Sequence, residues 1–161
     1  MSQAPSALGV DATVLAIEEL DGAAGGIFKR ARASLGVTAF GLNILDLPPN
    51  SGELYPEHTH RFDEQEEVYL ALAGSADLIL PDRAVPLDPG GLLARVAAGT
   101  RRGIRTGPDG VRLLVISGRP GRAYVPAPNS ELGGPEGPGS PDAASSMIPG
   151  TTQTLVARHR Y

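Results

Sequence analysis

The chain has 161 residues, of which 41% are hydrophobic and 20% are charged, so it is long enough for one ordinary globular core and too short to expect two. Cysteine is absent, which excludes disulfides, thiolate metal sites and a cysteine nucleophile. The formal net charge of -4 argues against general binding to nucleic acid, because that binding depends on neutralising phosphates.

The N-terminal residues lack a basic segment followed by a long apolar run, and no run in the sequence approaches the roughly 18 apolar residues of a membrane-spanning helix. We therefore expect a cytoplasmic protein with no membrane contact. The 21 glycines and 15 prolines favour many short strands joined by tight turns, with few helices.

Residues 1–36 are expected to form an N-terminal leader, in which 13–20 is an edge strand or one turn of helix; we favour the strand. The apolar run 37–47 then predicts the first strand of the main domain and ends at two prolines. Its apolar residues occupy both faces toward the end of the run, as in a strand that is covered on both sides. A second sheet or a partner chain must supply that cover, which predicts a homodimer joined through β faces or an N-terminal strand.

The stretch 52–74 carries two of the three histidines, and it is where we expect chemistry. His58 and His60 are two residues apart, so on a strand both imidazoles point to the same face. Glu67 begins a strand-forming run after a charged loop, and a hairpin would bring it beside the histidines. Two imidazoles and one carboxylate suit a first-row divalent ion with open positions.

The rest of the chain reads as short β units. SADLIL, AVPL and LLARV are predicted strands or strand leads, and GIRT and VRLLVIS are two further strands joined by a GPDG turn. Residues 130–161 are rich in Gly, Pro and Ser, and we expect them to form a disordered tail. Nucleotide-binding glycine loops and a GxSxG nucleophile turn do not occur in the sequence.

The histidine stretch resembles the first motif of the cupins. The resemblance rests on Gly52, His58, His60, Glu67 and Gly74. The gap between His60 and the glutamate is longer than usual in that family; Glu64 would restore the usual gap but would lose the spacing to Gly74. We therefore expect Glu67 to be the ligand. The resemblance implies an all-β, antiparallel double-stranded β-helix, the jelly-roll or cupin barrel, over residues 37–129.

A second cupin motif survives in its spacing from Gly91 onward, with altered chemistry. Ala97 stands where the family has proline, Arg102 stands in place of the fourth ligand histidine, and Thr106 replaces an asparagine. Arginine offers only hydrogen-bond donors and keeps its charge, so Arg102 cannot be a metal ligand. At most three ligands remain.

Two alternatives follow for Arg102. It pairs with Glu67 inside a metal-free barrel, or it binds a small anion beside a metal held by His58, His60 and Glu67. Tyr69 shares a strand face with Glu67 and is either a pocket wall or a contact to the ligand, so Arg102 and Tyr69 are the candidate substrate-binding residues. Glu66 points the other way, toward solvent or a subunit contact.

The sequence thus predicts a small cupin-domain protein with a divalent transition metal (Fe, Mn, Ni or Zn) that binds, and as an enzyme would transform, a small anionic metabolite. One alternative is a metal-free binding or sensor module that holds an anion through Arg102, with Arg105 as a further candidate. Another is a structural dimeric scaffold. Whether the protein is an enzyme stays open at this level.

Overall fold

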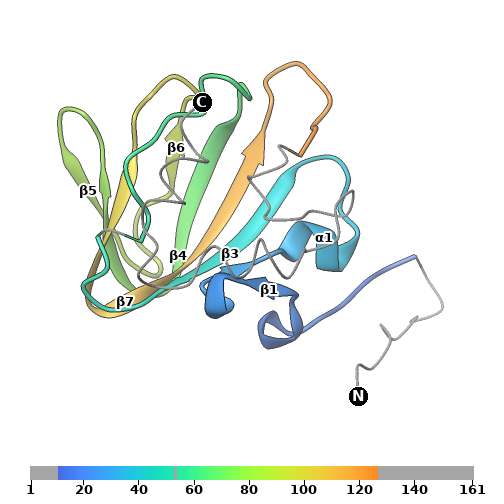
Figure 1. Ribbon diagram of the computed structural model, residues 1–161, viewed down its shortest axis with the longest axis horizontal. Helices are drawn as coiled ribbons and strands as arrows, with labels where there is room; N and C mark the ends of the chain where they lie inside the picture. Colours follow the sequence, from blue (N-terminus) through green and yellow to red (C-terminus); the bar gives the residue numbers. More distant parts are fainter. Residues whose placement is uncertain (1–10, 53, 127–161) are drawn as a thin grey trace.

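The computed structural model describes residues 11–52 and 54–126, and the predicted tail lies outside these ranges. Strands dominate, and the one α-helix of the described residues has five residues. The elements are η1 (Ile17–Glu19), β1 (Gly22–Ala23), η2 (Ala24–Gly26), β2 (Phe28–Lys29), α1 (Ala31–Leu35), β3 (Gly41–Leu47), β4 (Glu66–Ile79), β5 (Ala84–Leu87), β6 (Ala94–Val96) and β7 (Gly103–Gly118). They form an antiparallel 7-stranded sheet in the order β1-β2-β3-β7-β4-β5, with β6 beside β4 (Figure 1).

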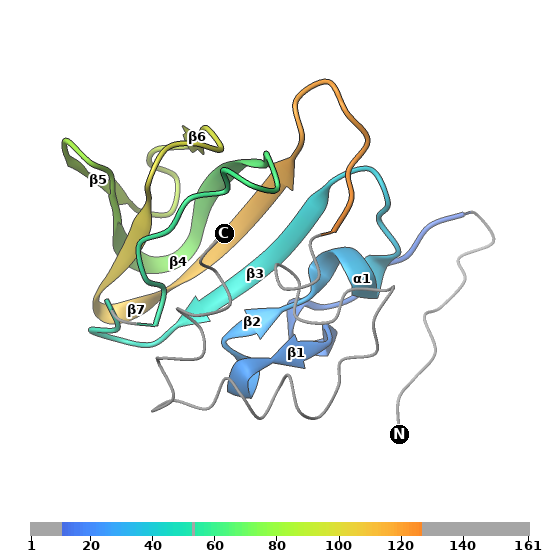
Figure 2. The same ribbon diagram turned by 45° about the horizontal axis from the view of Figure 1, so that its top comes forward.

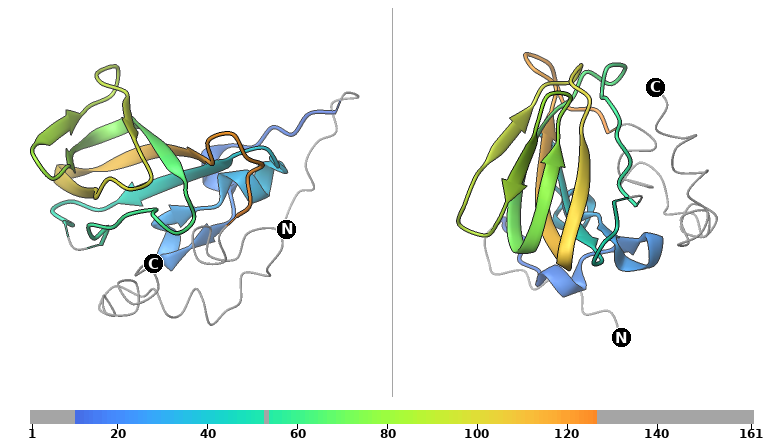
Figure 3. Two further views of the ribbon diagram at one scale, coloured as in Figure 1. Left: turned by 90° about the horizontal axis from the view of Figure 1, so that it is seen from above. Right: turned by 90° about the vertical axis from the view of Figure 1, so that its left-hand side faces the viewer.

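The centre of the sheet is a long bent pair made by β4 and β7. Their register runs from Glu66 opposite Gly118 to Ile79 opposite Gly103, with two register shifts on either side of Gly74. Gly74 has a φ of +69°, and a Cβ atom there would collide with the carbonyl of Gly110. The bend turns the last part of β4, which pairs with β5, away from the direction of its first part, which pairs with β6 (Figures 2 and 3).

This bend corrects the strand assignment made from the sequence. GIRT and VRLLVIS were expected as two strands on either side of a turn, but they are one strand, β7; the two predicted strands after residue 66 are likewise one strand, β4. The glycines bend each strand without ending its pairing. Glycine and proline mark a bend and a turn alike, so the pattern alone does not separate them.

The main core lies on the concave face of the sheet, where alternate residues of β3, β4 and β7 point inward. Its buried members are Leu45, Leu47, Tyr69, Ala71, Ala76, Leu78, Leu87, Val96, Ile104, Val111, Leu113 and Val115. Burial of this apolar set is the main stabilising contribution to the barrel.

The opposite face of β3 is covered by residues that precede it. Leu20, Ala31 and Ile44 form a second buried cluster, and β2 pairs with β3, so part of the predicted leader belongs to the sheet. The strand expected at 13–20 is wrong: this segment carries the single turn η1, and the Glu19 carboxylate accepts a hydrogen bond from the Ala16 N–H (2.9 Å). Such a cap favours a helical turn over an extended chain.

The same outward face continues over β4 and β7, where none of the residues 11–52 and 54–126 covers it fully. We call Val68, Leu70, Leu72 and Ile116 the outer patch; Leu72 and Ile116 are 38% and 37% exposed. Val68 lies opposite Ile116, so the patch crosses both strands. Within the described residues, no helix is long and apolar enough to cross a membrane.

Candidate functional site

The two histidines lie on a segment that pairs with the residues just before β7. The backbones of His58 and Arg102 exchange two hydrogen bonds (2.8 and 2.9 Å), and the His60 N–H donates to the carbonyl of Ala98 (2.9 Å). The predicted hairpin between this segment and β4 is therefore wrong. The residues between His60 and Glu67 form a turn, closed by the Glu64 N–H on the His60 carbonyl (2.9 Å), which carries the chain from that segment into β4.

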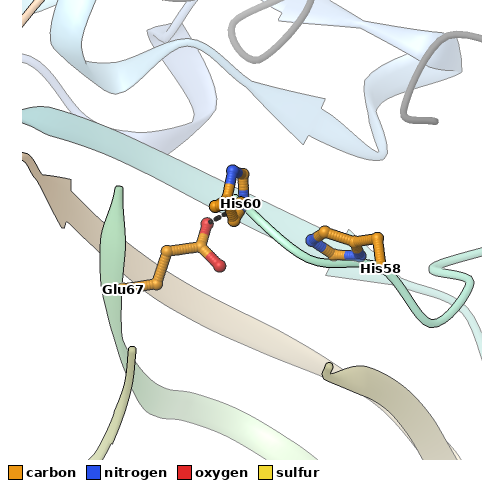
Figure 4. A group of neighbouring side chains, drawn as sticks. All are labelled: His58, His60 and Glu67. Atoms are coloured by element: carbon orange, nitrogen blue, oxygen red, sulfur yellow. Dashed lines mark ion pairs between the residues drawn. The ribbon is translucent and has the colours of Figure 1, made fainter. Parts of the chain in front are cut away.

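The predicted metal ligands nevertheless meet. His58, His60 and Glu67 each offer one ligand atom, and these atoms lie within 4.8 Å of one another. The imidazole rings are 5.1 Å apart, and His60 Nε2 is 3.2 Å from Glu67 Oε1 (Figure 4). Glu64, the alternative carboxylate, is exposed and binds Arg119 and Arg122.

Each imidazole is fixed by a hydrogen bond at Nδ1. His58 Nδ1 lies 2.9 Å from the carbonyl of Pro56, and His60 Nδ1 lies 2.8 Å from Asp63 Oδ2. Both partners accept, so Nδ1 carries the hydrogen and Nε2 of a neutral ring carries the lone pair that a metal requires. The sequence analysis did not find Asp63, because one carboxylate among several in a charged loop carries no distinguishing signal.

Glu67 divides its two oxygens between different neighbours. Oε1 faces His60, while Oε2 accepts hydrogen bonds from the Tyr69 hydroxyl and from Arg102 Nε, the latter at 3.1 Å. Burial alone would raise the pKa of this carboxyl. The close contact with His60, together with the charges of Arg102 and His58, outweighs burial and lowers the pKa of Glu67 to about 2.

The two histidines have opposite tendencies to ionise. Burial lowers the pKa of His58 to about 4, so this ring is neutral near pH 7. Burial also disfavours charge on His60, but the carboxylates of Asp63 and Glu67 outweigh it and raise the pKa of His60 to about 9. Without a metal, His60 is thus a cation beside Glu67.

His58, His60 and Glu67 are suitable ligands for a divalent ion. His60 Nε2 is buried, and its contact with Glu67 lacks the direction of a hydrogen bond, so among the described residues this nitrogen has no hydrogen-bond partner. A metal coordinated by Nε2 would provide one. Glu67 can offer Oε1 while Oε2 stays bound to Arg102 and Tyr69, and the set of two nitrogens and one oxygen leaves coordination positions open.

Arg102 is buried beside the Glu67 carboxylate and is fixed there by backbone carbonyls. Its side chain is 0% exposed, and Nη1 donates to the carbonyl of Thr100 (2.9 Å) and, more weakly, to that of Ala98 (3.4 Å). The structure therefore contains the Arg102–Glu67 ion pair, the first of the two alternatives drawn from the sequence. Arg105, also considered for anion binding, is exposed.

A small cavity of about 40 Å³ adjoins the histidines and Glu67. Its lining consists of Phe28, Asn43, Leu45, Tyr55, His58, His60, Gln65, Glu67, Val115 and Ser117. Among the described residues, the lining does not include Arg102 or Tyr69, the two predicted substrate-binding residues. Both bond to Glu67 instead, so their direct contact with a ligand stays a prediction.

Tyr55, Asn43 and Gln65 are cavity residues that the sequence analysis missed. Tyr55 meets the edge of the His58 ring at 5.1 Å, and its hydroxyl lies 3.4 Å from that of Tyr69. A signal existed for two of them: Asn43 is a polar residue in an apolar strand, and Gln65 lies two residues before Glu67 and so shares its face.

No protein-family model matches the sequence, and no curated protein is a detectable relative of it. Solved structures do match. A cupin protein from Bacteroides fragilis superposes with a TM-score of 0.55 at 19% identity, over 73% of this chain and 92% of that one. A sugar phosphate isomerase from a cupin superfamily, from Silicibacter pomeroyi, gives a TM-score of 0.52 at 20% identity, over 66% of this chain and 75% of that one.

This chain has the cupin fold. The prediction of an antiparallel all-β barrel of that kind is confirmed. In this cupin barrel the first-motif residues His58, His60 and Glu67 lie together, and Arg102, at the fourth-ligand position of the second motif, contacts Glu67. Thr106, in place of the motif's asparagine, accepts from the Ser51 N–H (2.8 Å) and donates to the Pro48 carbonyl (2.9 Å), so it fixes the loop after β3.

Proposed function

We propose that the protein binds one divalent transition-metal ion, from among Fe, Mn, Ni and Zn, through His58, His60 and Glu67, and binds a small anionic metabolite at the metal's open positions. The observation that carries the proposal is the convergence of these three side chains with both Nδ1 atoms already hydrogen-bonded. Orienting bonds of this kind to metal-binding histidines fix the ring and raise its basicity.

Arg102 would act as a positioning residue in this site. It holds Oε2 of Glu67, which directs Oε1 toward His60. One oxygen of Glu67 faces Arg102 and the other faces His60, so the negative charge of Glu67 offsets part of the repulsion between the guanidinium and a bound ion.

The charge balance of the site favours an anion. A divalent ion and Arg102 together carry three positive charges, against two negative charges on Glu67 and Asp63, if the metal displaces the proton of His60. A ligand with one negative charge would neutralise the remainder in a setting where unpaired charge is costly. When bound, a divalent ion supplies Lewis acidity and an activated water or substrate position.

A metal-free module is the second candidate, and the Arg102–Glu67 pair favours it, because that pair neutralises Glu67 without any ion. In that protein Arg102 would have to leave Glu67 to meet an anion. Metal-dependent binding needs no such rearrangement, so we place it first.

The test is the metal content of the untagged protein, measured by elemental analysis after purification and after incubation with Fe²⁺, Mn²⁺, Ni²⁺ or Zn²⁺. We expect about one ion per chain, reduced at least tenfold by Glu67→Gln or His58→Ala. Glu66→Gln is the matched control, since Glu66 neighbours Glu67 in sequence but binds Arg95 (2.6 Å). The proposal would be contradicted if the wild-type protein bound no metal, or if Glu66→Gln lost as much metal as Glu67→Gln.

We also infer that the outer patch of β4 and β7 is covered by a second copy of the chain. The patch continues the apolar face of β3 that the preceding residues cover, and it has no cover of its own among the described residues. A homodimer would bury it.

A further inference from the structure

Two buried amides line the cavity beside the proposed metal ligands. Gln65 is 1% exposed and Asn43 is 8% exposed, yet among the described residues Gln65 Nε2 and Asn43 Oδ1 have no hydrogen-bond partner. A buried donor and a buried acceptor left unpaired both cost stability. A polar ligand in the cavity would satisfy them.

The fold places the two amides on different strands around the cavity. Gln65 directly precedes β4 and lies on the face of Glu67, two residues away. Asn43 on β3 pairs with Val115 on β7, and Val115 pairs in turn with Tyr69 on β4. Asn43 is thus two strands from Tyr69, or about 10 Å between backbones.

The size of the cavity limits what it can hold. A volume of about 40 Å³ is room for a few water-sized groups. Metabolites of ordinary size occupy pockets of roughly 300 Å³ or more, so sugars and their phosphates do not fit this cavity. The remaining candidates are ligands of three or four heavy atoms.

We propose that Gln65 and Asn43 bind the free end of a small oxyanion of formate or bicarbonate size, whose other end lies at the metal. This inference rests on the proposed function, and it names the ligand class of that site. Gln65 Nε2 donates to an oxygen of the ligand, and Asn43 Oδ1 accepts from a hydroxyl where the ligand has one. The Ser117 hydroxyl in the lining can serve either role.

The experiment is a titration of sodium formate into ¹⁵N-labelled, Zn²⁺-loaded protein, followed by the side-chain amide signals. The sequence has three asparagines and three glutamines, so these signals are few and can be assigned by substitution. We expect formate to shift the Gln65 signal in a saturable way while that of exposed Asn50 stays fixed, and bicarbonate, which has a hydroxyl, to shift the Asn43 signal as well. Propionate, with two more carbons than formate, should not bind.

Gln65→Met keeps the length of the side chain and removes the amide, and it should weaken formate binding at least fivefold, as expected for one lost hydrogen bond. Asn50→Asp on the surface is the control and should leave formate affinity within twofold of wild type. If Gln65→Met binds as much metal as wild type, its weaker formate binding does not result from damage to the metal site.

The outcomes separate this inference from the proposed function. If zinc binds but formate moves neither amide, or if propionate binds as well as formate, the oxyanion subsite is wrong and the metal site stands. If zinc does not bind, the proposed function fails; formate is then titrated into the metal-free protein, where a saturable shift of the Gln65 amide would support the subsite and its absence would overturn it.

Discussion

Arg102 Nε donates to Glu67 Oε2 at 3.1 Å, and both side chains are buried, so an ion pair occupies the place where cupins carry a fourth metal ligand. The pair leaves the other carboxylate oxygen beside His60. In the proposed metal site, Arg102 would thus hold a ligand rather than act as one.

Arg102→Ala should destabilise the metal-free protein by roughly 3 kcal/mol, because Glu67 would be left buried without its cationic partner. Saturating Zn²⁺ should reduce this difference, since a metal on Oε1 neutralises the same carboxylate. Urea unfolding with and without metal measures both effects.

Arg101→Ala is the control: Arg101 is exposed and binds Glu57 (2.7 Å), so its loss should cost at most about 1 kcal/mol. Wild-type stability in metal-free Arg102→Ala would refute the prediction.

Stability of the metal-free protein should be greatest near pH 6.5. The pKa of His60 is about 9 in the folded protein against 6.5 when unfolded, so its contribution is complete below pH 6.5 and is lost as the pH rises to 9. The pKa of His58 is lowered to about 4, so stability also falls as the pH drops from 6.5 to 4. Each limb is on the order of 3 kcal/mol at most.

Urea unfolding from pH 4.5 to 9.5, followed by far-ultraviolet circular dichroism, checks this profile. In His60→Gln the fall above pH 6.5 should disappear while the acid limb stays. A wild-type profile that is flat between pH 6.5 and 9 would show that His60 does not carry the charge assigned to it.

Metal binding should release one proton at pH 7.5, because His60 must lose its hydrogen from Nε2 before that nitrogen can coordinate. Affinity for Ni²⁺ should therefore rise about tenfold per pH unit between 6.5 and 9 and level off above that. Isothermal titration in two buffers of different ionisation enthalpy counts the proton. Binding without proton release would mean that His60 is not a ligand or is already neutral.

The proximity of His58, His60 and Glu67 could be predicted from the sequence because they stand at a fixed spacing from Gly52 and Gly74. The strand pairing that brings these three side chains together could not be predicted from the sequence. The histidine segment pairs with the residues around Arg102, and that pairing depends on how β4 and β7 bend at their glycines. Strand-forming residues do not encode which neighbour a strand will take.

Asn43, Tyr55 and Asp63 were missed for a related reason. Their roles depend on contacts that the sequence pattern does not show. Asn43 lines a cavity formed by residues distant in sequence, and Asp63 contacts the His60 ring across the turn. The strand expected at 13–20 failed because a local cap at Ala16 outweighs the β propensity of the apolar residues there.

The outer patch should hold two copies of the chain together. Ile116→Asp places a charge opposite Val68, within the outer patch, and burying that charge in an interface would be costly. We expect sedimentation at micromolar concentration to give a dimer for wild type and a monomer for Ile116→Asp.

The control is Val125→Asp, which should stay dimeric, because Val125 is an exposed apolar residue beyond the end of β7. Both variants should keep the wild-type circular dichroism spectrum, because neither position belongs to the buried core. A monomeric wild type would reject the dimer, and a dimeric Ile116→Asp would move the interface to another surface.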